Sequence, residues 1–287
     1  MKTFKTKRYS LNFETWGNPN DRPALFFHGF PGSHAQARGL EPFLKENKMY
    51  LIAFDRPGYG RSTGKGTPLQ LVEALRELLN SLEIRKFEII GVSGGAPWAH
   101  IMASKFADDV LSLTIICGLG TYNAKTRPYF SNFQKKSLAL TKFLPRAVTN
   151  LILDTTAKRF HPEKKLKALA RFLCAADRAV IQDVANQSLI ADSMVEGRAQ
   201  GAKGIAQDIR LYRRDWLKKE CDLKKLAAIP TVYFHGKEDR ILDYRLSEWM
   251  HKANPKSRLL FFDDEGHYSI AFAQAKKILV ERLNHNN

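Results

Sequence analysis

A serine set between glycines forms the clearest chemical motif of this sequence. Residues 91–95 read GVSGG, which matches G-x-S-x-G, and they separate an apolar segment (FEII) from a helical pattern (APWAHIMASKF). A strand-to-helix turn of this kind requires glycine beside the serine, because Cβ atoms at Gly91 and Gly95 would clash. We expect the turn to lift the Ser93 hydroxyl out of the sheet, where it can act as a nucleophile.

A serine hydroxyl is a weak nucleophile until a base removes its proton. His267 follows the apolar segment LLFF and precedes the last helical pattern of the chain. That position places it on a loop at the same sheet edge as Ser93. The sequence therefore predicts His267 as the base.

An acid is expected after the preceding strand, TVYF, where residues 235–240 read HGKEDR. The H-G-x-x-D spacing selects Asp239, which would orient the imidazole and stabilise the imidazolium. Glu238 is a competitor, offset by one residue. Asp263 and Asp264 lie closer to the histidine in sequence, but they directly follow their strand and are interpreted as solvated turn carboxylates.

Backbone donors must also stabilise the oxyanion that forms during acyl transfer. The N–H of Gly94, directly after the serine, is one candidate. The second is the N–H of Phe30 in the loop HGFPGS at residues 28–33. Pro31 has no N–H to offer. His28 comes too early in the chain to be the base, and we expect it to hold this loop in place.

Six short apolar segments are expected to form the strands that position these residues. They are rich in β-branched and aromatic residues, as strands buried on both faces should be. These strands are residues 23–27, 49–54, 87–90, 113–117, 231–234 and 259–262, and helical patterns cover residues 69–82, 96–106, 246–253 and 269–283. The alternation predicts a mostly parallel sheet flanked by helices.

One long stretch breaks this alternation. Between residues 122 and 225 no strand pattern occurs, and segments 143–153, 166–175 and 205–217 have helical character. Because strands resume afterwards, we expect a helical cap at 122–225, inserted into a core domain made of residues 1–121 and 226–287.

The bulk composition limits which kinds of site and targeting segment the chain is expected to carry. The three cysteines have neither metal-site spacing nor the number for a disulfide framework, and no apolar run marks a secretory signal or a membrane span. We therefore expect a cytoplasmic protein that uses no cofactor and no metal. Its oligomeric state does not follow from the sequence.

The net charge of +17 is the unusual bulk property. Residues 122–225 contain 22 Lys or Arg against 10 Asp or Glu. A basic cap favours an anionic substrate or an anionic membrane surface as its partner, and a simple solvated face is the alternative. No nucleic-acid-binding motif accompanies the charge, so no nucleic-acid partner is expected.

Together the segments HGFPGS, DRPGYGRS, GVSGGAP, HGKEDR and EGHYS resemble the α/β-hydrolase superfamily, in its serine-nucleophile branch with a helical cap. The resemblance implies the α/β-hydrolase fold and an esterase or proline-iminopeptidase-like activity. The proline iminopeptidases of that superfamily typically have HGGPG and a tryptophan in the elbow, whereas Phe30 and Gly94 stand here. We expect a serine hydrolase that cleaves a carboxylic ester or related acyl bond of a small molecule through an acyl-enzyme. An aminopeptidase, a carbon–carbon bond hydrolase and a non-hydrolytic ligand receptor are the alternatives.

Overall fold

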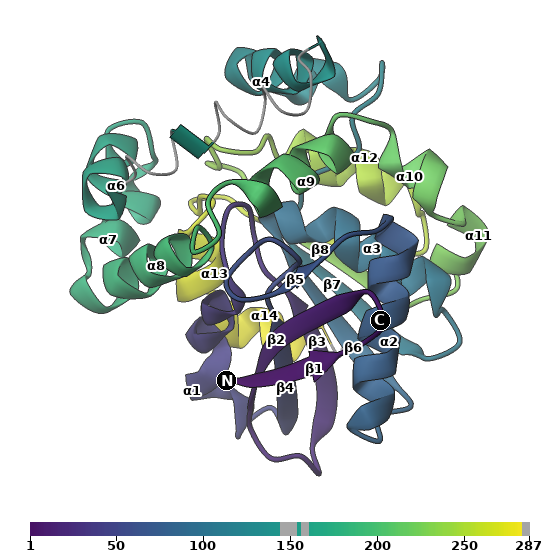
Figure 1. The fold of residues 1–287 in the computed structure, drawn as a ribbon. Helices are drawn as coiled ribbons and strands as arrows, with labels where there is room; N and C mark the ends of the chain where they lie inside the picture. The colour runs from purple at the N-terminus through teal and green to yellow at the C-terminus, as the bar shows by residue number, and fades with distance from the viewer. Residues whose placement is uncertain (144–153, 156–160, 283–287) are drawn as a thin grey trace.

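The computed structural model describes residues 1–143, 154–155 and 161–282, which build one central sheet with helices around it (Figure 1). The strands follow one another in space as β1-β2-β4-β3-β6-β7-β8-β9, and β5 pairs with β2. Their bounds are β1 Lys2–Lys5, β2 Tyr9–Trp16, β3 Arg22–Phe27, β4 Met49–Phe54, β5 Thr63–Gly64, β6 Phe87–Val92, β7 Val110–Ile116, β8 Thr231–Gly236 and β9 Arg258–Phe262.

The six predicted strands are confirmed as β3, β4, β6, β7, β8 and β9, and all of their mutual pairings are parallel. The sequence did not predict β1, β2 or β5, which pair antiparallel at one edge of the sheet. These edge strands carry polar residues along their length, as in YSLNFETW of β2, so they lack the continuous apolar run of the interior strands.

Helices cover both faces of the sheet. Apolar side chains of α2 (Pro68–Ser81), α3 (Ala96–Lys105) and α12 (Arg245–Ala253) pack in one core cluster with the strands. On the opposite face, α1 (Glu41–Leu44), α13 (Ser269–Ala273) and α14 (Ala275–Glu281) contribute to a second cluster, together with the 3₁₀ segment His34–Leu40. The helical pattern predicted over 269–283 is therefore interrupted at Gln274.

In its described part, the chain between β7 and β8 forms helices joined by loops, without any strand. Its α-helices are α4 Asn132–Phe143, α6 Pro162–Ala170, α7 Ala175–Gln182, α8 Val184–Glu196, α9 Lys203–Tyr212, α10 Trp216–Glu220 and α11 Leu223–Leu226. Helices α4, α6 and α9 lie beyond the end of the sheet at the top of Figure 1. Apolar side chains of this segment join the core cluster of α3, among them Leu138 of α4, Leu211 of α9, Trp216 of α10 and Leu226 of α11. The exact division into core and cap thus stays a prediction.

Two predicted cap helices end earlier than expected. The segment 166–175 is broken because Cys174 caps the N-terminus of α7, and the segment 205–217 is broken before Asp215, which caps α10. The segment predicted at 143–153 lies outside the described residues, apart from the last residue of α4. Within the described ranges, none of the helices has both the length and the apolar character needed to cross a membrane.

Candidate active site

Ser93 stands on a sharp turn between β6 and α3, in a left-handed backbone conformation with φ of 52°. The glycines beside it are required, as the sequence predicts. A Cβ at Gly91 would lie 2.7 Å from Cβ of Ala99, and a Cβ at Gly95 would lie 2.2 Å from the carbonyl oxygen of Phe27. The predicted clash at both positions is therefore confirmed.

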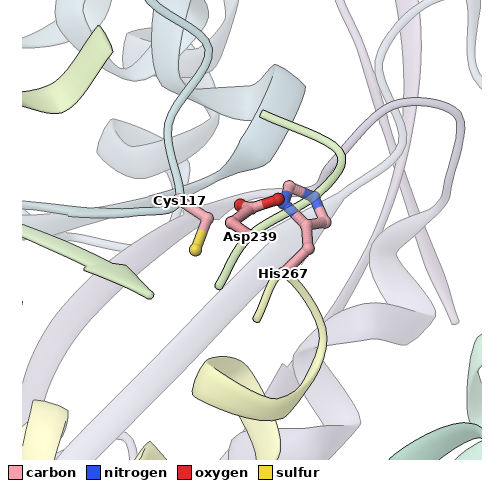
Figure 2. Close-up of side chains that lie close together, drawn as sticks. All are labelled: Cys117, Asp239 and His267. Carbon is pink, nitrogen blue, oxygen red and sulfur yellow. The ribbon is translucent and has the colours of Figure 1, made fainter. Parts of the chain in front are cut away.

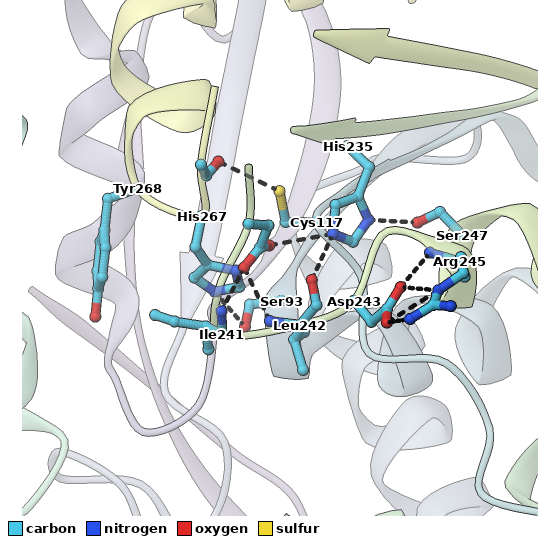
Figure 3. Close-up of polar contacts among 12 residues, drawn as sticks. Ser93, Cys117, His235, Ile241, Leu242, Asp243, Arg245, Ser247, His267 and Tyr268 are labelled. Atoms are coloured by element: carbon cyan, nitrogen blue, oxygen red, sulfur yellow. Dashed lines mark hydrogen bonds and ion pairs between the residues drawn. The ribbon is translucent and has the colours of Figure 1, made fainter. Parts of the chain in front are cut away.

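The structure brings the three predicted residues together in one chain of hydrogen bonds. His267 Nε2 lies 3.0 Å from Ser93 Oγ, and His267 Nδ1 lies 2.7 Å from Asp239 Oδ2 (Figure 3). Because the carboxylate only accepts, Nδ1 carries the proton, which leaves Nε2 free to accept the hydroxyl proton of Ser93. The loops after β6, β8 and β9 supply the three side chains.

Asp239 is a buried carboxylate whose oxygens are occupied by protein donors. Its Oδ1 accepts the N–H groups of Ile241 and Leu242, each at 2.8 Å. His235 Nε2 lies 3.1 Å from Oδ2 and 3.1 Å from the Leu242 carbonyl; since both partners only accept, this nitrogen carries a proton. Burial opposes ionisation of Asp239, but the charge of His267 and the hydrogen bonds from both histidines hold its pKa well below the usual range.

The competing carboxylates lie elsewhere. Glu238 is about half exposed and lies 3.7 Å from Arg240. Asp263 is 76% exposed and pairs with Lys237, and Asp264 is exposed as well. The solvated positions expected for the two aspartates are thus confirmed.

A carboxylate on α7, Asp177, supports the loop that carries His267. Asp177 is fully buried on α7 and accepts three backbone N–H groups, those of His267 at 2.9 Å, Tyr268 at 2.9 Å and Ser269 at 2.8 Å. It thereby satisfies donors at the start of α13, as a capping residue does. The sequence analysis missed it, because nothing local relates Asp177 to a loop 90 residues away.

Two opposing effects set the basicity of His267. Burial disfavours the imidazolium, but the charge and hydrogen bond of Asp239 and the charge of Asp177 outweigh it, so the pKa of His267 is raised. The imidazolium that would form on proton transfer from Ser93 is therefore stabilised by two carboxylates.

The loop with the predicted backbone donors adjoins the serine turn. A Cβ placed on Gly94 would lie 2.4 Å from Cβ of Phe30 and 3.2 Å from its backbone nitrogen, and a Cβ on Gly29 would lie 3.4 Å from Cβ of Ser93. The residues carrying both predicted N–H donors are thus neighbours, next to Ser93. On the cap side, the Tyr212 hydroxyl donates to the Gly94 carbonyl at 2.6 Å.

His28 lies within this loop and holds it, as predicted. Its Nδ1 contacts the Gly29 carbonyl at 2.8 Å, and its Nε2 accepts the backbone N–H of Arg56 at 3.3 Å. Burial and the charge of Arg56 hold the pKa of His28 well below its usual value, so the ring stays neutral. Arg56 also donates to the carbonyls of His28 and Gly29.

A buried ion pair joins this loop to the cap. Asp208 on α9 accepts from the Arg56 guanidinium at 2.6 Å, the Tyr59 hydroxyl at 2.7 Å and the Trp98 indole at 2.9 Å. Removing one partner of such a pair typically costs about 3–5 kcal/mol, because the other charge stays buried alone. The contact therefore fixes α9 over the core.

Cys117, Asp239 and His267 form a compact cluster in which one atom of each lies within 4.8 Å of the others (Figure 2). Its donor set does not suit a metal ion. Burial and the charge of Asp239 raise the pKa of the Cys117 thiol well above its usual value, and the Asp239 oxygens are already engaged by N–H groups. The cluster is accounted for by the hydrogen bonds of the aspartate and histidine.

Comparisons with known proteins agree with this arrangement. A family model described as alpha/beta hydrolase fold matches residues 23–274. The chain is 24% identical over 278 residues to the monoacylglycerol lipase ABHD6 of Mus musculus, covering 94% of this chain and 77% of the lipase. It is 25% identical over 287 residues to a probable proline iminopeptidase of Leptolyngbya boryana, covering 90% and 85% of the two chains.

Among solved structures, a thermophilic esterase from Thermogutta terrifontis superposes with a TM-score of 0.67 at 20% identity, over 98% of this chain and 96% of the esterase. At that identity the likeness shows the fold alone. The predicted fold class and family resemblance are confirmed by these matches.

The influence of Asp177 on His267 can be measured without any substrate. We expect the His267 imidazole to titrate above the usual value of about 6.5, and Asp177→Asn to lower that pKa because it removes a charge but keeps a carbonyl acceptor for the loop. NMR of the ring protons across pH gives the value, with His267→Gln to assign the signal. Asp192→Asn, at an exposed position of α8, is the control for loss of one charge. Equal titration curves in the two aspartate variants would contradict the role given to Asp177.

Proposed function

Because the chain belongs to the α/β-hydrolase fold family, we propose that it is a serine hydrolase that cleaves a carboxylic ester or related acyl bond of a small molecule. The observation that supports this most directly is the unbroken chain from Ser93 Oγ through His267 to Asp239, with separations of 3.0 and 2.7 Å. The monoacylglycerol lipase among the similar chains points the same way.

In the proposed reaction, Ser93 Oγ attacks the acyl carbon as its proton passes to His267 Nε2. The backbone N–H groups of Phe30 and Gly94 bind the oxyanion of the tetrahedral intermediate. His267 then protonates the leaving alcohol, and an acyl-enzyme remains on Ser93. In the second half, His267 removes a proton from water, the hydroxide attacks the acyl carbon, and Ser93 leaves with the proton returned to it.

Aminopeptidase activity is the second candidate, because a probable proline iminopeptidase is among the similar chains. Such an enzyme must bind the ammonium group of its substrate, which calls for an available carboxylate. Three buried carboxylates that adjoin this site, Asp177, Asp208 and Asp239, each accept at least three hydrogen bonds from protein groups. These three are therefore not available to bind an ammonium group.

Ser93→Ala tests the proposed nucleophile. We expect hydrolysis of a short-chain p-nitrophenyl ester to fall by at least about 10³-fold while the melting temperature stays unchanged, since only one hydroxyl is lost. Ser188→Ala, at an exposed position of α8, should keep full activity. Retention of more than about a tenth of the wild-type kcat in Ser93→Ala would refute the assignment.

The same assay separates the rival functions. Many turnovers per chain argue against a ligand receptor, which would give one slow event or none. A proline p-nitroanilide cleaved with higher kcat/KM than the ester would favour the aminopeptidase.

Asp239→Asn tests the proposed acid. The amide donates where the carboxylate accepted, so His267 is held with its proton on the wrong nitrogen, and we expect kcat to fall by about 10³-fold or more. Asp263→Asn and Glu238→Gln change exposed carboxylates and should alter kcat less than about threefold. A larger loss in either control than in Asp239→Asn would show that the acid is misassigned.

A further inference from the structure

A cavity of about 890 Å³ opens between α2, α4, α9 and α10. Its described lining residues include neither Ser93 nor His267. Five of them are basic and come from separate parts of the cap, and one is acidic. The basic residues are Lys142, Arg210, Arg213, Arg214 and Lys219, and the acidic residue is Glu220.

Such an excess of like charge around one space is unfavourable unless an anion occupies it. The Arg214 guanidinium lies 2.9 Å from Glu220, so one charge is compensated. With five basic residues and one acidic residue, the described lining keeps a net charge of +4.

The rest of the lining is apolar or adds to the positive potential. Leu69 and Tyr122 present aliphatic and aromatic surface, whereas Trp98, Leu138 and Leu211 are themselves buried. The N-terminus of α2, a helix of 14 residues, also borders the cavity through Thr67 and Leu69, and the partial positive charge of a helix N-terminus favours anions. The lining thus combines basic side chains with apolar ones.

We propose that this cavity binds an anionic amphiphile, with a phosphate or carboxylate head group among the basic residues and a short apolar part over Leu69 and Tyr122. The site is separate from the reacting residues, because α9 turns Asp208 and Tyr212 towards Arg56 and Gly94, while its Arg210 and Leu211 line the cavity. This binding proposal does not depend on the proposed hydrolysis.

Titration calorimetry at low salt tests the proposal with octyl phosphate, octanoate and neutral octanol as probes. The proteins are the wild type, Ser93→Ala, the double variant Lys142→Gln/Lys219→Gln and the matched control Lys224→Gln/Lys225→Gln. All four lysines are exposed, so the substitutions remove charge without opening the core, and the control pair lies on α11, outside the lining.

We expect one octyl phosphate per chain, and both anions binding at least about tenfold more tightly than octanol. Affinity for octyl phosphate should fall at least about fivefold in Lys142→Gln/Lys219→Gln, remain within about twofold in the control, and be unchanged in Ser93→Ala. Absence of saturable binding to the wild type overturns the proposal. So does an equal loss in both lysine pairs, which indicates diffuse charge, or a loss in Ser93→Ala, which places the ligand at the reacting serine.

Discussion

The tight turn at Ser93 is the constraint on which the rest of the site depends. A non-glycine residue held at φ of 52° is strained, and the turn persists because its surroundings leave no alternative. Helix α3 and the end of β3 approach so closely that neither Gly91 nor Gly95 could carry a side chain. The hydroxyl is consequently fixed at the sheet edge where the loops after β8 and β9 place Asp239 and His267.

Buried charges then tie those loops to the helices that cover them. Asp239 and Asp177 both hold His267, one through the imidazole and the other through the backbone. Through Arg56, Asp208 likewise holds the loop that carries Phe30. A carboxylate fully withdrawn from water is stable only with such a full set of donors, so displacing the helices α7 and α9 would disturb both loops. Helices α7 and α9 therefore help to hold the site together.

The sequence predicted those features that depend on local pattern. Apolar strands followed by short loops located Ser93, Asp239 and His267, because in a parallel sheet the strand ends share one edge. The sequence did not predict the features that depend on contacts between residues far apart in the chain. The cap residue Asp177 carries no local sign of its role, and β2 was missed because its side chains at the sheet edge are partly polar. The helix expected over 166–175 is interrupted because Cys174 caps α7. The spacing of apolar residues alone does not show where one helix ends and the next begins.

Covalent labelling of Ser93 tests the central claim most directly. A fluorophosphonate loses fluoride to an activated serine and leaves a phosphonyl ester on its oxygen, which intact-mass and peptide analysis can locate. The account predicts one adduct per chain, on Ser93, formed in step with the loss of esterase activity and slowed sharply by His267→Gln, since the base is then absent. Loss of activity with the adduct on another residue, or equally fast labelling without the imidazole, would contradict it.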